Sequence, residues 1–365
     1  MAKPKKILVI CPHPENVAPG QRLKYEQYFD HWRNNGYSVT VSPFFSERMQ
    51  SILYNKSNKL EKIFWVLRAY VKRVVGLFSL QKYDLVYIFL WVTPFGYPLM
   101  ERLYLAVNPN VVYDIDDAIF IKAESVVNRS IDFMRGRSKP FFLMKLARHV
   151  IACTPFLTEV AASYNKKVTD ISSTINTDSY QPVNNYQNDH KLILGWSGSH
   201  STSPFLYLLK DVLLELHQKI PFKLMVMGDP SFHIDGIEME ALPWSVESEV
   251  PVLQKFDIGL YPLPLDNEWV LGKSGLKALQ YMAVGLPVVA TAIGANYRII
   301  ENGRTGILVK TKEEWMEKIL LLMEDAVLRK KIGTAARENV VSNYSIHANA
   351  PLYLNIINSC CRNNT

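Results

Sequence analysis

The sequence predicts an α/β protein built from two open-sheet domains. Short apolar runs typical of buried parallel strands alternate with amphipathic segments in both halves of the chain. A polar, Asn-rich stretch at 181–190 separates the halves. The length of 365 residues suits two or three domains of roughly 150 residues each, so we expect two domains joined near residue 183.

Composition and charge exclude several classes of protein. Apolar residues make up 48% and charged residues 21% of the chain, which excludes a disordered chain, a collagen-like repeat and a coiled-coil rod. The 41 basic and 34 acidic residues give a net charge of +7, which suits anionic partners of several kinds. No helix-turn-helix signature, RNP-like strand or dense basic tail is present, so we expect no nucleic-acid partner.

Cysteine usage and hydropathy point to the cytoplasm. The four cysteines form no CxxC pair and no disulfide framework. The apolar run at 7–11 is too short for the core of a signal peptide, and no stretch reaches the ~18 apolar residues of a membrane-spanning helix. We therefore expect a cytoplasmic protein, and contact with the cytoplasmic face of a membrane stays open.

The N-terminal half opens with a β-α-β pattern. Its parts are an apolar run at 7–11, a polar–apolar helix at 21–34 and a second strand at 38–41. Further strands are expected at 84–89, 111–115 and 149–153.

The alternation starts again after residue 191. We expect strands at 192–196, 223–227, 257–261, 287–291 and 306–309, and helices at 205–218 and 275–284.

The stretch 273–291 is the most informative part of the sequence. A polar turn that contains Gly275 opens a helix, Gly285 ends it, and a buried strand follows. The first turn of a helix leaves N–H groups unpaired and carries the positive end of the dipole, so it can hold a phosphate. Lys273 and Lys277 are unfavourable beside that dipole, a conflict that a bound anion would resolve. The alternative is two solvated surface lysines.

This stretch resembles the nucleotide-sugar-binding signature of GT-B glycosyltransferases, specifically retaining family 4, also called group 1. Gly275, Gly285 and the runs 282–283 and 287–291 match the signature. The flanking stretches 257–262 and 301–309 also resemble those of the family, in order and at the right spacing.

The resemblance implies two Rossmann-like open-sheet domains that face a cleft, the GT-B arrangement. Residues 1–183 would bind the acceptor, 184–345 the nucleoside-diphosphate sugar, and 346–365 would return to the N-terminal domain. The implied reaction is hexosyl transfer, with retention, to a glycan or a lipid-linked acceptor. It would serve cell-surface polysaccharide or glycoconjugate synthesis and need no metal ion or other cofactor.

Two positions depart from the family pattern. The family has a glutamate at each end of a Glu-x7-Glu motif, where this chain has Gly272 and Gln280. Gln280 can still hydrogen-bond the donor ribose, whereas Gly272 offers no side chain. Asp266 and Glu268 are nearby candidates to compensate.

Two segments are expected to bind the donor. The loop after the strand at 192–196 carries Gly198, Ser199 and His200, without the Arg and Lys that many relatives have there. The negative charge of the diphosphate would instead be neutralised at the start of the helix. The candidate residues there are Lys273, Ser274, Gly275 and Lys277, followed by Gln280.

Two segments of the N-terminal half are further candidates. Gln21 and Arg22 follow the first strand, where GT-B enzymes contact acceptor or donor phosphate; otherwise they only begin a helix. Asp116 and Asp117 follow the strand at 111–115, and we expect one of them to stabilise positive charge on the sugar or to accept the acceptor proton. The alternative is a helix cap. An Asp-x-Asp metal site belongs to the other glycosyltransferase architecture, so no metal is expected here.

The segment 59–82 is basic and amphipathic. Apolar residues recur at helical spacing between lysines and arginines. Such a helix suits the surface of an anionic bilayer, or it packs on the sheet with a solvated basic face.

Two alternatives to catalysis by transfer remain open. The missing glutamates fit a non-catalytic, donor-binding partner subunit of a glycosyltransferase. A GT-B epimerase that acts on a nucleotide sugar is the other alternative.

Overall fold

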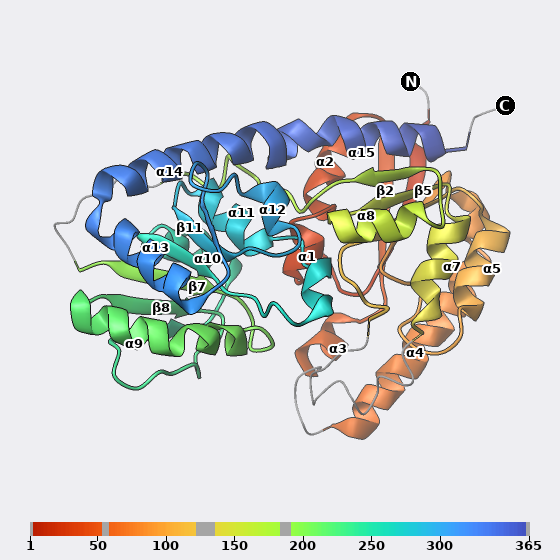
Figure 1. The fold of residues 1–365 in the computed structure, drawn as a ribbon. Helices are drawn as coiled ribbons and strands as arrows, with labels where there is room; N and C mark the ends of the chain where they lie inside the picture. The colour runs from red at the N-terminus through yellow and green to blue at the C-terminus, as the bar shows by residue number, and fades with distance from the viewer. Residues whose placement is uncertain (1–2, 53–57, 122–135, 183–190, 363–365) are drawn as a thin grey trace. The chain divides into compact units, whose positions relative to one another are not determined.

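The computed structural model describes residues 3–52, 58–121, 136–182 and 191–362. The chain forms two compact units (Figure 1). Met1–Ser173 and Asn349–Thr365 make up the N-terminal unit, and Thr174–Ala348 make up the C-terminal unit. Each unit contains a parallel six-stranded sheet with flanking helices, which confirms the α/β class expected from the sequence.

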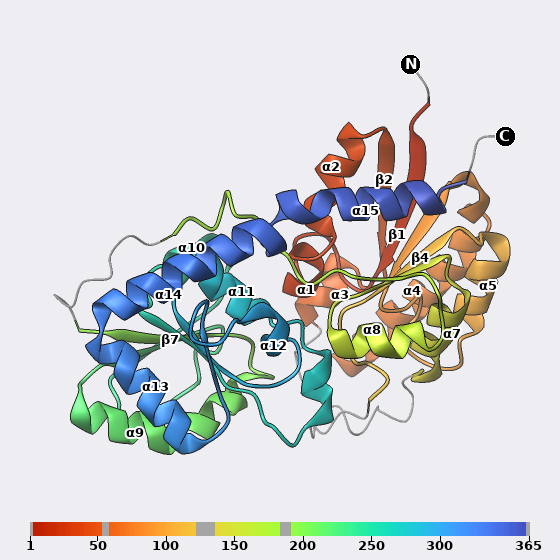
Figure 2. The ribbon, with the colours of Figure 1, turned by 45° about the horizontal axis from the view of Figure 1, so that its top comes forward.

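The sheet of the N-terminal unit has the strand order β2-β1-β3-β4-β5-β6. Figure 2 labels β2, β1 and β4 of this sheet. Its strands are β1 (Lys5–Cys11), β2 (Tyr37–Pro43), β3 (Leu85–Phe89), β4 (Val111–Ile115), β5 (His149–Ala152) and β6 (Val168–Asp170). Every residue of β3 and β4 is buried, which explains their continuous apolar sequences, since parallel strands are covered on both faces. The chain adds β2 on one side of β1 and then β3 on the other, so the strand order reverses at β1 and β3.

The helices of the N-terminal unit differ from the prediction near the start of the chain. They are α1 (Pro19–Arg22), η1 (Glu26–Tyr28), α2 (Phe29–Asn34), α3 (Glu47–Ile52), α4 (Lys59–Leu77), η2 (Leu80–Lys82), α5 (Leu99–Val107), α7 (Ser138–Leu146), α8 (Pro155–Ala162) and α15 (Ile346–Cys360). The single helix expected at 21–34 is wrong, because α1 ends at Arg22 and two further pieces follow. The break lets the side chains of Lys24 and Tyr25 enter the interior, where both are fully buried.

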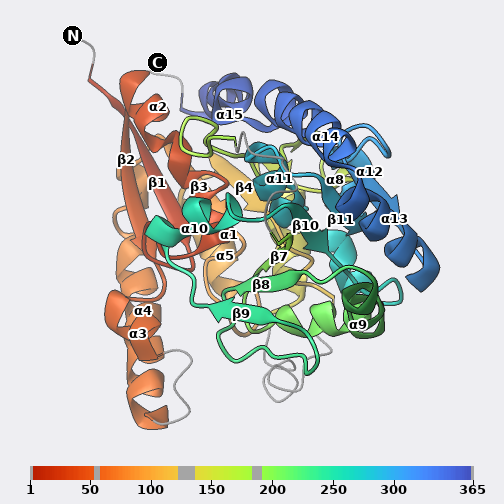
Figure 3. The same ribbon diagram turned by 90° about the vertical axis from the view of Figure 1, so that its left-hand side faces the viewer.

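The sheet of the C-terminal unit has the order β12-β11-β10-β7-β8-β9 (Figure 3). Its strands are β7 (Ile193–Ser197), β8 (Lys223–Met227), β9 (Met239–Leu242), β10 (Ile258–Tyr261), β11 (Val288–Thr291) and β12 (Ile307–Val309). Alternate residues of β8 enter two separate apolar clusters: Met225 and Met227 join one, and Leu224 and Val226 join the other. This alternation shows that both faces of the sheet are packed.

In the C-terminal unit, most helices lie between successive strands in the sequence. The helices of this unit are η4 (Ser203–Leu209), α9 (Lys210–Lys219), α10 (Val246–Leu253), η5 (Glu268–Gly272), α11 (Leu276–Ala283), α12 (Asn296–Ile299), α13 (Lys312–Glu324), α14 (Ala326–Asn339) and the π-helical turn η6 (Val340–Tyr344). In the parts of the chain that the structure describes, no helix is both long and apolar enough to cross a bilayer.

The division between the units falls before the boundary expected at 183. The segment that follows Ser173 belongs to the C-terminal unit. There the backbone N–H of Ile175 donates to the carbonyl of Tyr344, and Arg337 donates to the carbonyl of Thr177. Most of the linker expected at 181–190 lies outside the described residues. At the other end, α15 packs Tyr353 on the ring of Tyr28 in the N-terminal unit, with ring centroids 4.5 Å apart.

Candidate functional site

The strand order of the C-terminal unit marks a place for a ligand. The chain adds β8 and β9 on one side of β7 and then β10 on the other. In open parallel sheets, ligands bind outside the carboxyl ends of the strands at such a reversal. Strand β7 ends at Ser197, so the predicted residues Gly198, Ser199 and His200 form the loop at this point.

Gly198 brings this loop against helix α11. Its backbone N–H donates to the carbonyl of Met227 over 2.9 Å. A Cβ at Gly198 would lie 2.4 Å from the Trp196 ring and 2.7 Å from Cε of Lys277. Only glycine permits this approach, so the structure brings two of the predicted donor-binding segments into contact.

His200 is oriented by a carboxylate on the neighbouring strand end. Its Nδ1 lies 2.6 Å from Oδ1 of Asp229, while its side chain is 67% exposed. Burial alone would raise the pKa of Asp229, but hydrogen bonds from Ser203 and Ser231 and the nearby imidazole lower it below its usual value. The carboxylate therefore stays charged and holds one ring nitrogen. Sequence reasoning missed Asp229, although its place just after the strand at 223–227 was a usable signal.

Ser199 lies in the same loop and is linked to its neighbours. Its Oγ is 2.8 Å from Oγ of Ser201, and its carbonyl accepts the N–H groups of Thr202 and Ser203. The loop is therefore a small hydrogen-bonded turn in front of η4.

Helix α11 begins in the way that the sequence predicts for an anion site. Its N-cap, Gly275, has φ of 72°, and a Cβ there would lie 2.3 Å from Cδ1 of Ile299. No side chain caps the helix, and no acidic residue lies in its first turn. The first N–H groups and the positive end of the dipole are thus left for another acceptor. Lys273 and Ser274 lie immediately before this turn.

Lys277 is strongly altered by its surroundings. Its Nζ lies 5.4 Å from the ring centroid of Trp196 and 5.4 Å from that of Tyr261. Burial and then the charge of Lys273 lower the pKa of Lys277 to about 7. Lys277 is half-buried, and it has no ion pair or hydrogen bond with any residue that the structure describes. It is therefore not a solvated surface lysine.

Lys273 lies beside an aromatic ring as well. Its Nζ is 3.4 Å from the ring centroid of Trp269 in η5. Both predicted lysines thus have an aromatic neighbour, and each adds to the positive potential around the other.

Gln280 forms a buried network instead of lining the helix start. Its Nε2 donates to Oε1 of Glu249 over 2.9 Å and to the hydroxyl of Tyr180 over 3.1 Å. Glu249 also accepts Nε1–H of Trp244 over 2.9 Å and the hydroxyl of Tyr180 over 2.6 Å. A glutamate at 280 would face this carboxylate without a proton to donate, which gives a physical reason for the glutamine. Sequence reasoning missed Glu249, and Gly272 and the exposed Asp266 and Glu268 add nothing to this network.

In the N-terminal unit, Gln21 holds the loop after β1. It is 1% exposed, accepts the N–H of His13 over 2.9 Å and donates to the carbonyl of His13 and to Glu26. These bonds occupy its amide within the protein. Arg22 is half-buried and ends α1.

Asp116 and Asp117 differ in their surroundings. A Cβ at Gly20 would lie 2.9 Å from Oδ2 of Asp116, so the Asp116 carboxylate touches the backbone just before Gln21. Oδ1 of Asp117 instead accepts the N–H of Ala118 over 2.8 Å. The structure thus brings Asp116 next to the α1 segment and gives Asp117 a contact typical of a local turn.

A buried ion pair lies at the end of β4. Nζ of Lys24 is 3.0 Å from Oδ1 of Asp114, and both side chains are 0% exposed. Tyr87 donates to the same carboxylate, and Lys24 donates to the carbonyl of Ile171. Burial alone would lower the pKa of Lys24, but the Asp114 carboxylate raises it above its usual value. Asp114 inside an apolar strand was the sequence signal for this pair.

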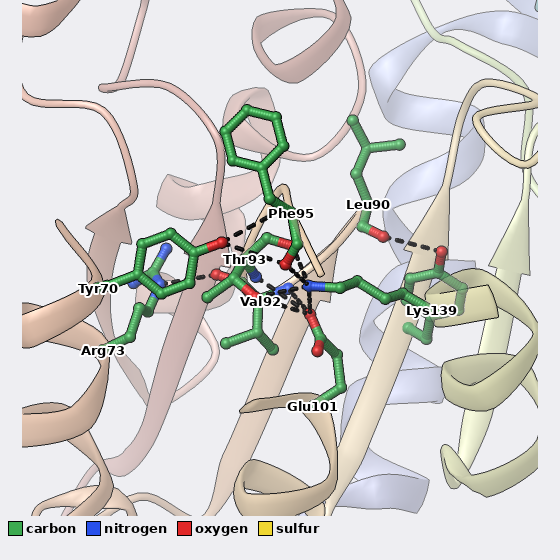
Figure 4. Close-up of polar contacts among 9 residues, drawn as sticks. Tyr70, Arg73, Leu90, Val92, Thr93, Phe95, Glu101 and Lys139 are labelled. Carbon is green, nitrogen blue, oxygen red and sulfur yellow. Dashed lines mark hydrogen bonds and ion pairs between the residues drawn. The ribbon is translucent and has the colours of Figure 1, made fainter. Parts of the chain in front are cut away.

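A second buried cation holds the loop after β3 (Figure 4). Nζ of Lys139 lies 3.3 Å from Oε1 of Glu101 and donates to both oxygens of Thr93 over 2.7 Å. Glu101 accepts the N–H groups of Val92 and Thr93. This loop follows the strand at which the order of the N-terminal sheet reverses, so the pair shapes one side of that edge.

Neither unit shows a cluster of metal-ligating side chains among its described residues. Among the residues that the structure describes, no three His, Cys, Asp or Glu side chains are arranged to hold a metal ion.

Comparison with known proteins finds a family match in the C-terminal part of the chain. Residues 191–325 match the model of the family described as glycosyl transferases group 1. Trehalose synthase of Pyrococcus horikoshii is 36% identical over 85 residues, which are 23% of this chain and 20% of that protein. The chain therefore spans only a fifth of the length of that curated relative.

Solved structures are similar to nearly the whole chain. A glycosyltransferase from Rickettsia africae has a TM-score of 0.70 at 15% identity. The match covers 98% of this chain and 99% of the Rickettsia chain. HepE from Anabaena, solved in complex with UDP-glucose, has a TM-score of 0.64 at 14% identity. The match covers 97% of this chain and 99% of the HepE chain. At such identity the likeness shows the fold. The chain is therefore a protein of the GT-B glycosyltransferase fold whose residues 191–325 match the group 1 glycosyl transferases.

Proposed function

We propose that the protein is a retaining, family 4 hexosyltransferase that uses a nucleoside-diphosphate sugar. The observation that carries the proposal is Lys277: a desolvated lysine at an uncapped helix start, with no carboxylate near it among the described side chains. A cation in such a place is costly unless an anion joins it. A diphosphate fits, because it brings the negative charge that both Lys277 and the first turn of α11 lack.

The leaving diphosphate would be stabilised by the protein alone. Lys273, Lys277 and the N–H groups of the first turn of α11 would meet the charge that develops as the glycosidic bond breaks. This arrangement would take the place of a metal ion. Gly198 would allow the phosphates to approach the backbone, and Ser199 and His200 would contact the donor from the loop after β7. Gln280 would act through its network, by fixing the face of α11.

The N-terminal unit would bind the acceptor. Asp116 is our candidate for the group that stabilises positive charge on the sugar or accepts the acceptor proton, because its carboxylate lies at the backbone of α1. Arg22 is the candidate for an acceptor or donor phosphate. Asp117 and Gln21, which were also candidates, have contacts that favour a structural role.

Acceptor and location are further parts of the proposal. We propose a glycan or lipid-linked acceptor, as in the synthesis of cell-surface polysaccharide, which would place the reaction at the cytoplasmic face of a membrane. The relatives support the general activity: the trehalose synthase by its name, and HepE by the UDP-glucose in its structure.

The first test is binding. Thermal unfolding in the presence of UDP-, GDP-, ADP- and dTDP-sugars should reveal one that stabilises the protein, since a ligand of the native state raises its stability by mass action. In calorimetry with that donor, Lys273→Ala should bind tenfold or more weakly, about 1.5–3 kcal/mol for a lost charged hydrogen bond. Lys331→Ala, an exposed lysine of α14, is the matched control. Equal affinity in Lys273→Ala and wild type would refute the diphosphate site.

The second test is turnover. With the labelled donor and a lipid extract, transfer of label to lipid or glycan supports the proposal. Binding without turnover would mark a donor-binding subunit, and an altered free nucleotide sugar would mark an epimerase. Asp116→Asn should reduce transfer and leave donor affinity unchanged, whereas equal transfer rates would remove Asp116 from the catalytic role.

A further inference from the structure

Helix α4 presents an apolar stripe to solvent. Eight apolar side chains at helical spacing are each between 47% and 87% exposed: Leu60, Ile63, Phe64, Leu67, Val71, Val74, Val75 and Phe78. Their spacing is the one that normally turns toward a core. A continuous exposed apolar surface of this kind marks a site of interaction.

The opposite face of α4 explains why the stripe points outward. Arg73 is 1% exposed and donates to the carbonyls of Ser42, Val92 and Cys11. Tyr70 donates to the carbonyl of Phe95 over 3.1 Å (Figure 4). The polar side chains of α4 thus anchor it to the ends of β1 and β2 and to the loop after β3. The helix cannot turn its apolar face inward without breaking these bonds.

Charge around the stripe favours one kind of partner. Lys59, Arg68, Lys72 and Lys82 are exposed in or just beyond the helix. The acidic residue of the helix, Glu61, is ion-paired with Arg48 at 2.8 Å. Lysine is depleted at protein–protein interfaces. An apolar face bordered by lysine and arginine is instead the pattern of a helix that lies in the surface of an anionic bilayer.

We infer that the exposed face of α4 docks the protein on anionic phospholipid. The apolar stripe would enter the boundary between headgroups and acyl chains, and the flanking cations would contact lipid phosphates or carboxylates. This inference deepens the proposed function, because it names the surface at which a lipid-linked acceptor would be met. Docking itself needs neither donor nor turnover.

Flotation with vesicles tests the stripe. Wild-type protein should bind vesicles made of equal parts phosphatidylcholine and phosphatidylglycerol, and binding should weaken with salt. The triple variant Leu67→Gln, Val71→Gln, Val75→Gln should partition about tenfold or more weakly, because three inserted side chains become polar. Val327→Gln, at an exposed apolar position of α14, should bind as wild type. Equal partitioning of the triple variant and wild type would overturn the inference.

A second pair of variants tests the lipid charge. Lys59→Gln with Arg68→Gln should weaken binding to the anionic vesicles by about fivefold for each cation removed. Lys330→Gln with Lys331→Gln removes the same charge from exposed positions of α14 and should have little effect. Binding to pure phosphatidylcholine as tight as to the anionic mixture would also overturn the inference.

A label on the helix distinguishes a bilayer from a second copy of the chain. Leu67→Cys can carry a polarity-sensitive fluorophore, because the four native cysteines are buried. Its emission should shift to the blue on addition of anionic vesicles and stay constant with protein concentration in their absence. A blue shift that depends on protein concentration alone would identify self-association and refute the lipid surface. Donor titration of the triple variant should match wild type, so failure of donor binding in both would refute the proposed function and leave docking intact.

Discussion

The surroundings of desolvated lysines differ between the two units. In the N-terminal unit, Lys24 meets Asp114 at 3.0 Å and Lys139 meets Glu101 at 3.3 Å. In the C-terminal unit, Lys277 lies between two aromatic rings, and none of the described carboxylates pairs with it. We propose that a buried lysine with its own carboxylate organises the fold, whereas a desolvated lysine without one is suited to bind an anion from solution. Under the proposed function, this difference distinguishes lysines that stabilise the fold from the lysine that would bind the donor.

The largest expected effect concerns the pair at the end of β4. Lys24→Met leaves the Asp114 carboxylate buried without its cation, so we expect a loss of about 3–5 kcal/mol in the free energy of unfolding. Urea unfolding measures it. Asp114→Asn in the same chain should restore part of the loss, since the charge is removed while Tyr87 keeps an acceptor. Lys331→Met is the exposed control. A fully stable Lys24→Met would show that the pair does not hold the N-terminal unit.

The same substitution at the unpaired lysine should act in the opposite way. Lys277→Met removes a desolvated charge, so the stability of the free protein should not fall. Affinity for the nucleotide sugar should fall by tenfold or more, about 1.5–3 kcal/mol. Calorimetry and urea unfolding of one preparation test both. A destabilised Lys277→Met with normal donor affinity would reverse the comparison between the units.

A smaller effect is expected in the network below α11. Gln280→Glu places a second carboxylate beside Glu249, so we expect a loss of about 1–3 kcal/mol at neutral pH. Crowding of two carboxylates raises their pKa values, and the defect should shrink as pH falls and one becomes protonated. Adding Glu249→Gln should restore stability. If thermal unfolding shows Gln280→Glu to be as stable as wild type, the network does not account for the glutamine.

The mildest effect is a pH dependence of donor binding. The pKa of Lys277 is lowered to about 7 in the free protein, and a bound diphosphate would raise it. Binding therefore takes up a proton above that pH, and affinity should decline as pH rises through 7 toward the pKa of the complex. A nucleotide sugar is the proper probe, because its diphosphate does not titrate in this range. The decline should be absent in Lys277→Met, and a flat profile in wild type would contradict the assignment.

The folding side of the same linkage has a definite sign. The unfolded chain holds the Lys277 proton up to the usual lysine pKa, well above the folded value. Between these values the unfolded state binds more protons, so stability of the free protein should rise with pH. Lys277→Met should lack that part of the rise.

Much of the fold could be predicted from local patterns. The strands expected at 84–89 and 111–115 correspond to β3 and β4, because continuous apolar runs identify parallel strands wherever they pair. The Gly275 turn and the start of α11 were predictable as well, since a left-handed glycine before a helix is a local property. The helix expected at 21–34 failed because the burial of Lys24 depends on Asp114, far along the chain.

The residues of the candidate site could be named from the sequence, whereas their contacts could not. Gly198 and Lys277 were named from the sequence, but their contact depends on the packing of α11 against the end of β7. Gln280 was expected at the ribose, whereas its partner Glu249 lies on another helix and gave no local signal.

The sequence by itself determined the α/β class, most of the strands and the glycine turn before α11, because periodicity and glycine conformation act over a few neighbouring residues. Only the tertiary structure decided which charges have partners and which way α4 faces. Burial and polar contacts join residues that are distant in the chain. Hydrogen bonds from Arg73 to the carbonyls of Ser42, Val92 and Cys11 hold this side chain in the interior, and the apolar stripe of α4 therefore faces outward.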